Sequence, residues 1–358
     1  MKIFIIAGAR PNFMKISPII EELKKHPHIT YKLIHTWQHF DKNMSDAFFE
    51  DLSLPYPDVN LGVHLGSVSN MTWRTMIEFD ELIKNELPDY VLVVWDVNAT
   101  IACSFVAKQN GVKVIHVEAW LRSFDSTMPE EINRVLTDHI SDFLFVTENS
   151  GMVNLKNEWV TSWVYFVWNV MIDTLMQNKH IFERGSKAKD LWLAWKKYAL
   201  ITIHRPSNVD RRENLEKLLV NFRKLSEKIT LVLPLHPRTK WSIEKFGLES
   251  ILQSPNIIIL DALWYLDFMN LVIHATCVLT DSGWIQEETT YLEIPCLTMR
   301  ENTERPVTVE IGSNTLVWSD FDLIDQHISD ILSWKYKKWR IPDLWDGKTS
   351  KRILEYIQ

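Results

Sequence analysis

The chain has 358 residues, 46% of them hydrophobic, and a formal net charge of -7. This length predicts two domains with sizeable cores, and the acidic balance argues against a nucleic-acid partner. No apolar run approaches the roughly 18 residues of a transmembrane helix, so we expect a soluble, cytoplasmic protein with no membrane partner.

Short apolar runs rich in β-formers alternate with longer helix-compatible stretches, starting at Lys2. The first half predicts amphipathic helices over 15–25 and 76–85, and strands at 2–7, 31–36, 90–94, 112–117, 143–147 and 164–167. The second half predicts strands at 198–203, 230–235, 256–260, 277–280, 295–299 and 315–317. This alternation predicts an α/β fold of two doubly wound domains with parallel sheets and a cleft between them.

We expect the domains to cover 1–168 and 169–345, with a C-terminal helix at 346–358 packing back on the first. The three cysteines, Cys103, Cys277 and Cys296, lie in or beside apolar runs, which predicts buried free thiols. The 12 histidines have no metal-ligand spacing, so no metal site is expected.

Charged side chains follow several predicted strands of the first domain. Arg10 and Lys15 come after the first strand, where ligands of open α/β sheets bind, and Arg10 suits bidentate binding of a diphosphate. A solvated loop with surface cations is the alternative. Asp96 and Glu118 end two further strands and should face the same cleft. Glu130 follows Pro129 at a predicted helix start, where an acid also has a structural role.

Several acids near one substrate allow one to act as an acid and another as a base. In the second half, His204 and His236 end neighbouring strands, which favours phosphate contact or proton transfer. Asp281–Gly283 forms a small-residue turn before a helix, a pattern typical of phosphate binding. One turn further, Gln286–Glu288 offers oxygens suited to ribose hydroxyls. Arg305 adds a cation, and Phe268 suits either base stacking or the core.

Taken in order, these motifs resemble the non-hydrolysing UDP-N-acetylglucosamine 2-epimerases over nearly the whole chain. The matching segments are Gly8–Pro11, Gln38–Asp41, Asp96–Asn98, His116–Ala119, Leu121–Ser123, Met128–Arg134, Asn169–Asp173, Thr202–Ser207, Leu235–Arg238, Tyr265–Asn270, Thr280–Gly283, Gln286–Glu288 and Glu301–Pro306.

The resemblance implies two Rossmann-like domains of the GT-B type, a UDP-sugar substrate, a homodimer and no cofactor. It also implies epimerisation at C2 of UDP-N-acetylglucosamine to UDP-N-acetylmannosamine, by elimination and re-addition of UDP. By position, the resemblance assigns Asp96, Glu118, Glu130 and His204 to catalysis. The predicted substrate-binding residues, from position and charge together, are Arg10, Lys15, His236, Phe268, Ser282, Gly283, Glu288 and Arg305.

Glycine is scarce and tryptophan abundant, at 10 and 16 residues. The family pattern has glycine where this chain has Trp37, Trp95, Trp120, Trp168, Trp264, Trp284 and Glu293. This chain also departs from the family pattern at His64–Ser67 and Asn70–Thr72. Glycine permits a positive φ that a bulky side chain disfavours.

Our hypothesis is an altered or engineered descendant of an epimerase, with indoles reshaping the cleft, or a sequence error at glycine codons. The competing functions are a hydrolysing epimerase, a GT-B glycosyltransferase and an inactive or engineered scaffold with an indole-lined cleft.

Overall fold

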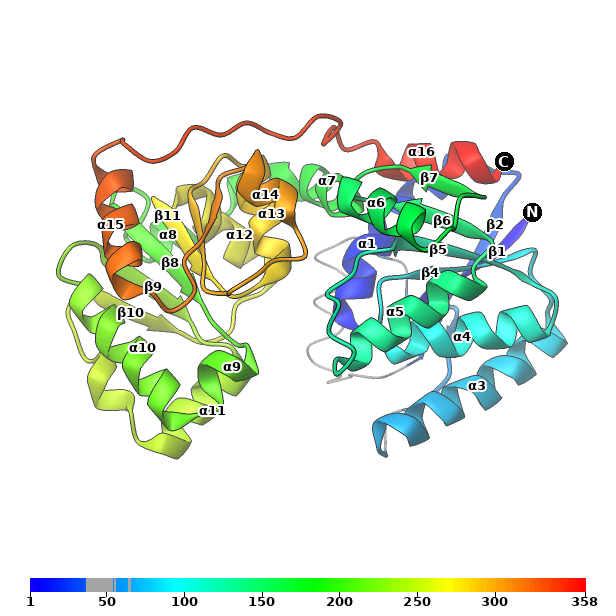
Figure 1. Cartoon of the computed structure of the whole chain (residues 1–358), viewed down its shortest axis with the longest axis horizontal. Helices are drawn as coiled ribbons and strands as arrows, with labels where there is room; N and C mark the ends of the chain where they lie inside the picture. Colours follow the sequence, from blue (N-terminus) through cyan, green and yellow to red (C-terminus); the bar gives the residue numbers. More distant parts are fainter. Residues whose placement is uncertain (37–53, 55, 64–65) are drawn as a thin grey trace. The chain divides into compact units, whose positions relative to one another are not determined.

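A computed structural model describes residues 1–36, 54, 56–63 and 66–358, apart from the side chains of Arg10 and Pro11. The chain forms two compact units (Figure 1). Unit 1 contains Met1–Gln177 and Leu344–Gln358, and unit 2 contains Asn178–Asp343.

Unit 1 is built on a parallel sheet of seven strands in the order β3-β2-β1-β4-β5-β6-β7. Its strands are β1 (Lys2–Ala7), β2 (Thr30–His35), β3 (Val59–Asn60), β4 (Tyr90–Val94), β5 (Lys113–Ala119), β6 (Phe143–Val146) and β7 (Val164–Phe166). Its helices are α1 (Arg10–Leu23), α3 (Val68–Asn85), α4 (Asn98–Gln109), α5 (Pro129–Ile140), α6 (Asn149–Asn157), α7 (Val170–Arg184), which runs on into unit 2, and α16 (Thr349–Ile357).

The strand order of unit 1 reverses between β1 and β4. Because right-handed crossovers that run in opposite directions put their helices on opposite faces, α1 and α4 cover different sides of the sheet. Helices α3, α4 and α5 lie side by side (Figure 1), and α16 packs against α1. Ligands of such sheets bind at the carboxyl ends of the strands beside the reversal, which for unit 1 means the ends of β1 and β4.

Unit 2 repeats this plan with six parallel strands in the order β10-β9-β8-β11-β12-β13. Its strands are β8 (Tyr198–Thr202), β9 (Thr230–Pro234), β10 (Ile257–Leu260), β11 (Cys277–Thr280), β12 (Cys296–Thr298) and β13 (Asn314–Leu316). Its other helices are α8 (Lys187–Asp190), α9 (Pro206–Val209), α10 (Arg212–Leu225), α11 (Pro237–Phe246), a 3-10 turn (Glu249–Leu252), α12 (Tyr265–His274), α13 (Gly283–Tyr291), α14 (Pro306–Glu310) and α15 (Phe321–Leu332).

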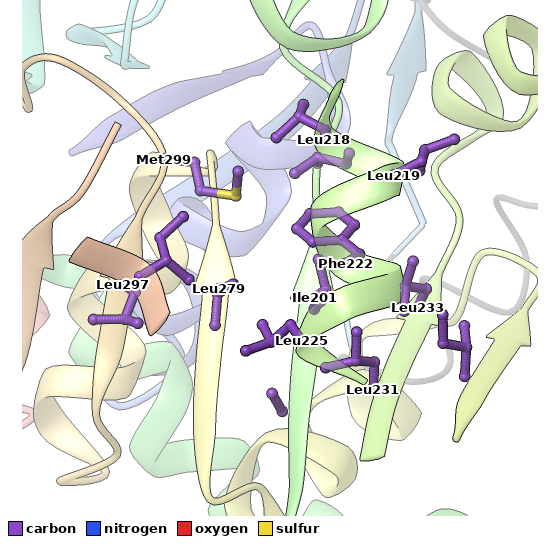
Figure 2. Close-up of a cluster of buried hydrophobic side chains, with 14 of the residues drawn as sticks. Ile201, Leu218, Leu219, Phe222, Leu225, Leu231, Leu233, Leu279, Leu297 and Met299 are labelled. Carbon is purple, nitrogen blue, oxygen red and sulfur yellow. The ribbon is translucent and has the colours of Figure 1, made fainter. Parts of the chain in front are cut away.

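The core of unit 2 shows how an amphipathic helix is fixed to the sheet. Leu215, Leu218, Leu219 and Phe222 of α10 are buried at helical spacing. Figure 2 shows Leu218, Leu219 and Phe222 within a cluster of buried aliphatic side chains from the strands. Burying one such side chain stabilises the fold by about 1.5–3 kcal/mol, so this packing holds the strands rigidly below the site at their carboxyl ends.

The prediction of an α/β fold with two doubly wound Rossmann-like units of the GT-B type is confirmed. Each of the twelve predicted strands is present to within a residue or two at its ends. The two-residue strand β3 escaped prediction because it is too short to show a pattern. Helices α1 and α3 begin at Arg10 and Val68, earlier than predicted. The three cysteines are free and buried, as predicted.

Among the described residues, no helix combines the length and the apolar character needed to cross a membrane. The matching segment Gln38–Asp41 lies outside the described residues, as do the departures from the family pattern at Trp37 and His64–Leu65.

Candidate functional site

The carboxyl edge of the unit 1 sheet brings Lys15, Asp96 and Glu118 together. Glu118 lies at a bulge in β5, where the register with β6 shifts between Val117 and Ala119. Its φ is +68°, in the left-handed region. Lys15 reaches from α1 and forms an ion pair with the Glu118 carboxylate, and both residues are only 5% exposed. An ammonium and a carboxylate thus share a water-poor site, where electrostatic interactions are strong.

Asp96 follows β4 and is 2% exposed. Its Oδ2 lies 2.9 Å from the Arg134 guanidinium, whereas no described group pairs with its buried Oδ1. Burial raises the pKa of Asp96 to about 6, although the positive charges of Arg134 and Lys15 oppose the rise. A carboxyl that titrates near neutral pH is suited to take up and release a proton during catalysis.

Helix α5 carries the third predicted carboxylate. Pro129 occupies its first turn, as expected from the sequence. Glu130 is exposed, and its charge acts on Asp96. Its neighbour Glu131 is buried and accepts hydrogen bonds from the backbone N–H groups of Ser123 and Phe124, at 3.0 and 3.1 Å. Glu131 therefore has a structural role, because it holds the backbone at Ser123 and Phe124.

Three residues that hold this site were not singled out from the sequence. Asn12 Oδ1 accepts from the N–H groups of Gly8 and Ala9, at 3.0 and 2.8 Å, so those two donors already have a partner. Asn133 donates to the Asp96 carbonyl at 2.9 Å, and Arg134 pairs with its carboxylate. For Asn133 and Arg134, the sequence signal is helical spacing, since both follow Glu130 by about one turn. The side chain of Arg10 lies outside the described atoms.

The carboxyl edge of unit 2 carries the predicted histidines. His204 Nδ1 lies 3.0 Å from Asp281 Oδ1, and the His204 and His236 rings are 5.1 Å apart. Desolvation and the neighbouring His204 lower the pKa of His236. Asp281 also accepts from the N–H groups of His204 and Arg205, so it fixes the loop that carries His204.

The predicted turn before a helix is present, because Ser282 is the N-cap of α13 and Gly283 its first residue. An added Cβ at Gly283 would meet nothing closer than 3.8 Å, from Glu304. The Gly283 N–H at this helix start is suited to an anion, whereas Ser282 N–H donates to Thr280 Oγ1 at 3.0 Å.

Of the three predicted oxygen donors on α13, two also support the fold. Gln286 Oε1 accepts from Thr303 and Asn314 at 2.7 and 2.9 Å, and Glu287 pairs with Arg305 at 2.5 Å. These contacts anchor the loop that carries Arg305 and the strand β13. That Gln286 and Glu287 contact a ribose stays a prediction.

Glu288 is fully buried beside an aromatic group. Its Oε1 accepts from the Tyr265 hydroxyl at 2.8 Å, and no described atom bonds its buried Oε2. Burial raises the pKa of Glu288 well above its usual range. The ring of Trp284 lies 6.2 Å from those of Tyr265 and Phe268. An unsatisfied carboxyl oxygen beside aromatic faces suits a hydroxyl-bearing ligand with a planar group.

Residues 21–358 match the family model of UDP-N-acetylglucosamine 2-epimerase. The chain belongs to this family. It is 40% identical to the UDP-N-acetylglucosamine 2-epimerase of Methanococcus maripaludis, over 99% of this chain and 98% of the relative. It is 38% identical to the UDP-2,3-diacetamido-2,3-dideoxy-D-glucuronate 2-epimerase of Pseudomonas aeruginosa, over 100% and 99% of the two chains.

A crystal structure of the Methanocaldococcus jannaschii UDP-GlcNAc 2-epimerase with UDP-GlcNAc and UDP is also similar. It superposes with a TM-score of 0.89 at 38% identity, covering 100% of this chain and 99% of that one. The resemblance drawn from the ordered motifs is thereby confirmed.

Several positions at which we expected the family to have glycine keep a glycine-like backbone. Trp95, Trp120, Trp168 and Glu293 have φ values of +63°, +68°, +71° and +59°. Trp264 differs, because its φ of -68° is accessible to any residue. The side chains also differ in direction. Trp120 is fully buried and packs in the core with Leu144 and its neighbours, whereas the Trp95 ring lies 5.1 Å from Lys15 Nζ.

The described residues contain no group of three or more His, Cys, Asp or Glu side chains that could hold a metal ion.

Proposed function

We propose that this chain epimerises C2 of UDP-N-acetylglucosamine to give UDP-N-acetylmannosamine. The observation that carries the proposal is the buried ion pair of Lys15 and Glu118 next to Asp96, in a chain of the UDP-N-acetylglucosamine 2-epimerase family. A weakly acidic proton on C2 needs a carboxylate base in such a water-poor site.

The proposed reaction has two halves. A carboxylate of unit 1 takes the C2 proton while the C1–O bond breaks, and UDP leaves with the electron pair. The intermediate, 2-acetamidoglucal, then takes a proton at C2 on the opposite face, and UDP re-adds at C1. Asp96, Glu118 and Glu130 are the candidate acids and bases, and Lys15 lies where it can stabilise developing negative charge.

Unit 2 is the proposed binding site for UDP. The start of α13, at Ser282 and Gly283, is suited to the diphosphate because the Gly283 N–H and the helix dipole favour an anion. Glu288 has a buried oxygen to offer to the ribose. Phe268, one turn after Tyr265 on α12, is the residue proposed for the uracil. The cations and histidines proposed to act on the diphosphate are Arg10, Arg305, His204 and His236.

The alternative of an inactive or engineered scaffold rests on the indoles. Trp120 does not support it, because its side chain is buried in the core of unit 1. Trp95 and Trp284 lie beside proposed ligand groups, so the assay below decides between the two readings.

The test is turnover of UDP-N-acetylglucosamine in D2O, followed by proton and phosphorus NMR. We expect UDP-N-acetylmannosamine with deuterium at C2, because the second proton comes from a solvent-exchanged acid. Free N-acetylmannosamine with UDP would instead indicate a hydrolysing epimerase, and transfer that requires an added acceptor would indicate a glycosyltransferase. Turnover of only UDP-2,3-diacetamido-2,3-dideoxy-D-glucuronate would move the proposal to that sugar.

The variants Asp96→Asn and Glu118→Gln should each lose at least about 10²-fold in kcat, the scale of general acid–base catalysis. Glu355→Gln, an exposed site on α16, is the matched control and should keep wild-type turnover. A folded wild-type protein with no turnover of either sugar would refute the proposal and favour the scaffold.

We also propose a homodimer formed through helices α3, α4 and α5. These neighbouring helices expose large apolar side chains, with Ile77 41%, Phe105 45%, Ile132 49% and Leu136 51% exposed. Such a shared apolar face is typical of an interface. Light scattering should give twice the chain mass for wild type and the monomer mass for Leu136→Glu. Val220→Glu, on the partly exposed side of α10, should leave the dimer intact.

A further inference from the structure

A buried network of charged groups lies beside Asp96 and Glu118, with Asp138 of α5 at its centre. Asp138 Oδ1 lies 2.7 Å from His116 Nδ1. Asp138 Oδ2 accepts from the backbone N–H of Trp120 at 3.1 Å and from the Arg122 guanidinium at 2.7 Å. Asp138 and His116 are 2% and 0% exposed. The proposed reaction gives none of these groups a part, although burying them is costly unless all are paired.

His116 connects this network to the backbone next to Asp96. Its Nε2 lies 2.8 Å from the carbonyl oxygen of Trp95, the residue directly before Asp96. The two ring nitrogens of His116 thus link the Asp138 side chain to the backbone directly before Asp96. This link holds the Trp95 backbone at a φ of +63°.

The same carboxylate holds both sides of the bulge that carries Glu118. His116 lies two residues before Glu118 and Trp120 two residues after it, and both bond to Asp138. Glu118 and Trp120 each have a φ of +68°. Such a strained backbone costs about 1–3 kcal/mol per residue and persists only where its surroundings fix it.

We propose that Asp138 is a positioning residue for the reaction, because through His116 and the Trp120 N–H it fixes the backbone that aims both Asp96 and Glu118. The inference rests on the proposed epimerase function. Asp138 does not touch substrate. Its effect is on the direction of two carboxylates that must approach one carbon atom.

The test compares two variants. Asp138→Ala removes every hydrogen bond of the Asp138 side chain, whereas Asp138→Asn keeps the side-chain shape and can still bond His116 and Trp120. A misplacement of about 1 Å costs about 10²-fold in rate, so Asp138→Ala should lower kcat about 10²-fold. Asp138→Asn should recover most of that loss. KM should stay within a factor of about 3 in both, because the proposed UDP contacts lie on unit 2. Calorimetric titration with UDP counts the competent molecules, so kcat is expressed per folded site.

Glu158→Gln is the matched control. Glu158 pairs with Arg122 at the solvent side of the network. Its neutralisation leaves the hydrogen bonds of Asp138 in place, so kcat should be unchanged. If Asp138→Ala does not fold, His116→Gln replaces it, since this variant keeps a donor for Trp95 and loses the bond to Asp138. It should lower kcat at least tenfold without raising KM.

Nitrogen-15 NMR of labelled histidines provides a readout that needs no turnover. Wild type should show one histidine ring N–H that is protected from exchange with solvent because His116 is 0% exposed, and its signal should vanish in His116→Gln. Unchanged kcat per folded site in Asp138→Ala, or a loss that appears only in KM, would overturn the inference and leave the epimerase function standing. Absence of wild-type turnover would overturn the proposed function, and this inference with it.

Discussion

Replacing three exposed tryptophans by glycine should stabilise this protein. Trp159, Trp192 and Trp334 each stand two residues past the last residue of α6, α8 and α15, with φ values of +60°, +57° and +61°. At α15, Trp334 N–H donates to the Ile331 carbonyl at 3.1 Å and Lys335 N–H to the Asp330 carbonyl at 2.8 Å. These two bonds define a Schellman motif, in which the left-handed residue is usually glycine.

The chain itself provides the reference. Gly111 and Gly247 are the left-handed residues at the ends of α4 and α11, with φ of +73° and +64° and the same pair of backbone bonds. An L-residue in this conformation costs about 1–2 kcal/mol, and the greater unfolded-state freedom of glycine offsets about 0.4–1 kcal/mol of that gain. Trp159, Trp192 and Trp334 are 91%, 75% and 90% exposed, so little packing is lost.

We therefore expect a gain of about 0.5–1 kcal/mol per site, additive over separate helices. The assay is urea unfolding followed by far-UV circular dichroism, because tryptophan fluorescence changes with the substitution itself. The control is Trp195→Gly in unit 2, which is 80% exposed and has no positive φ. It should be neutral or slightly destabilising. If the triple variant is no more stable than Trp195→Gly, the strain argument fails.

Three further predictions concern single side chains. Because the pKa of Asp96 is about 6 in the folded protein and about 3.9 in an unfolded chain, its contribution to stability is full below pH 4 and is lost as pH rises through 6. Asp96→Asn lacks this loss, so wild type should lose up to about 3 kcal/mol relative to the variant between pH 4 and 7; parallel urea curves would contradict this. Glu288→Gln should weaken UDP binding about tenfold by calorimetry, because it leaves a ribose hydroxyl poorly matched; unchanged affinity would remove Glu288 from the site. Asn270→Ala should cost about 2–4 kcal/mol in urea unfolding, because Asn270 bonds the buried main chain of Phe182, Gly185 and Ala188; a loss below about 1 kcal/mol would mean that water replaces it.

The tryptophans show which left-handed positions a sequence pattern can predict and which it cannot. That glycine preceded them at the family positions is a hypothesis, and the positive φ angles at Trp95, Trp120 and Trp168 support it. The positions after α6, α8 and α15 were not identified from the sequence. A helix end without glycine gives no local sign of a left-handed turn, because the turn is fixed by backbone bonds to the helix behind it.

The sequence by itself determined the two doubly wound units, because strand and helix periods are local properties repeated along the chain. It also indicated Asp96, Glu118 and His204, since side chains at the ends of parallel strands meet at one edge. Only the tertiary structure showed which of the expected oxygen donors also support the fold. Gln286 and Glu287 hold Arg305 and β13 through partners that come from elements distant in sequence. Asp138 is proposed as a positioning residue for the same reason. Its contacts with His116 and the Trp120 N–H form only when α5 packs against β5.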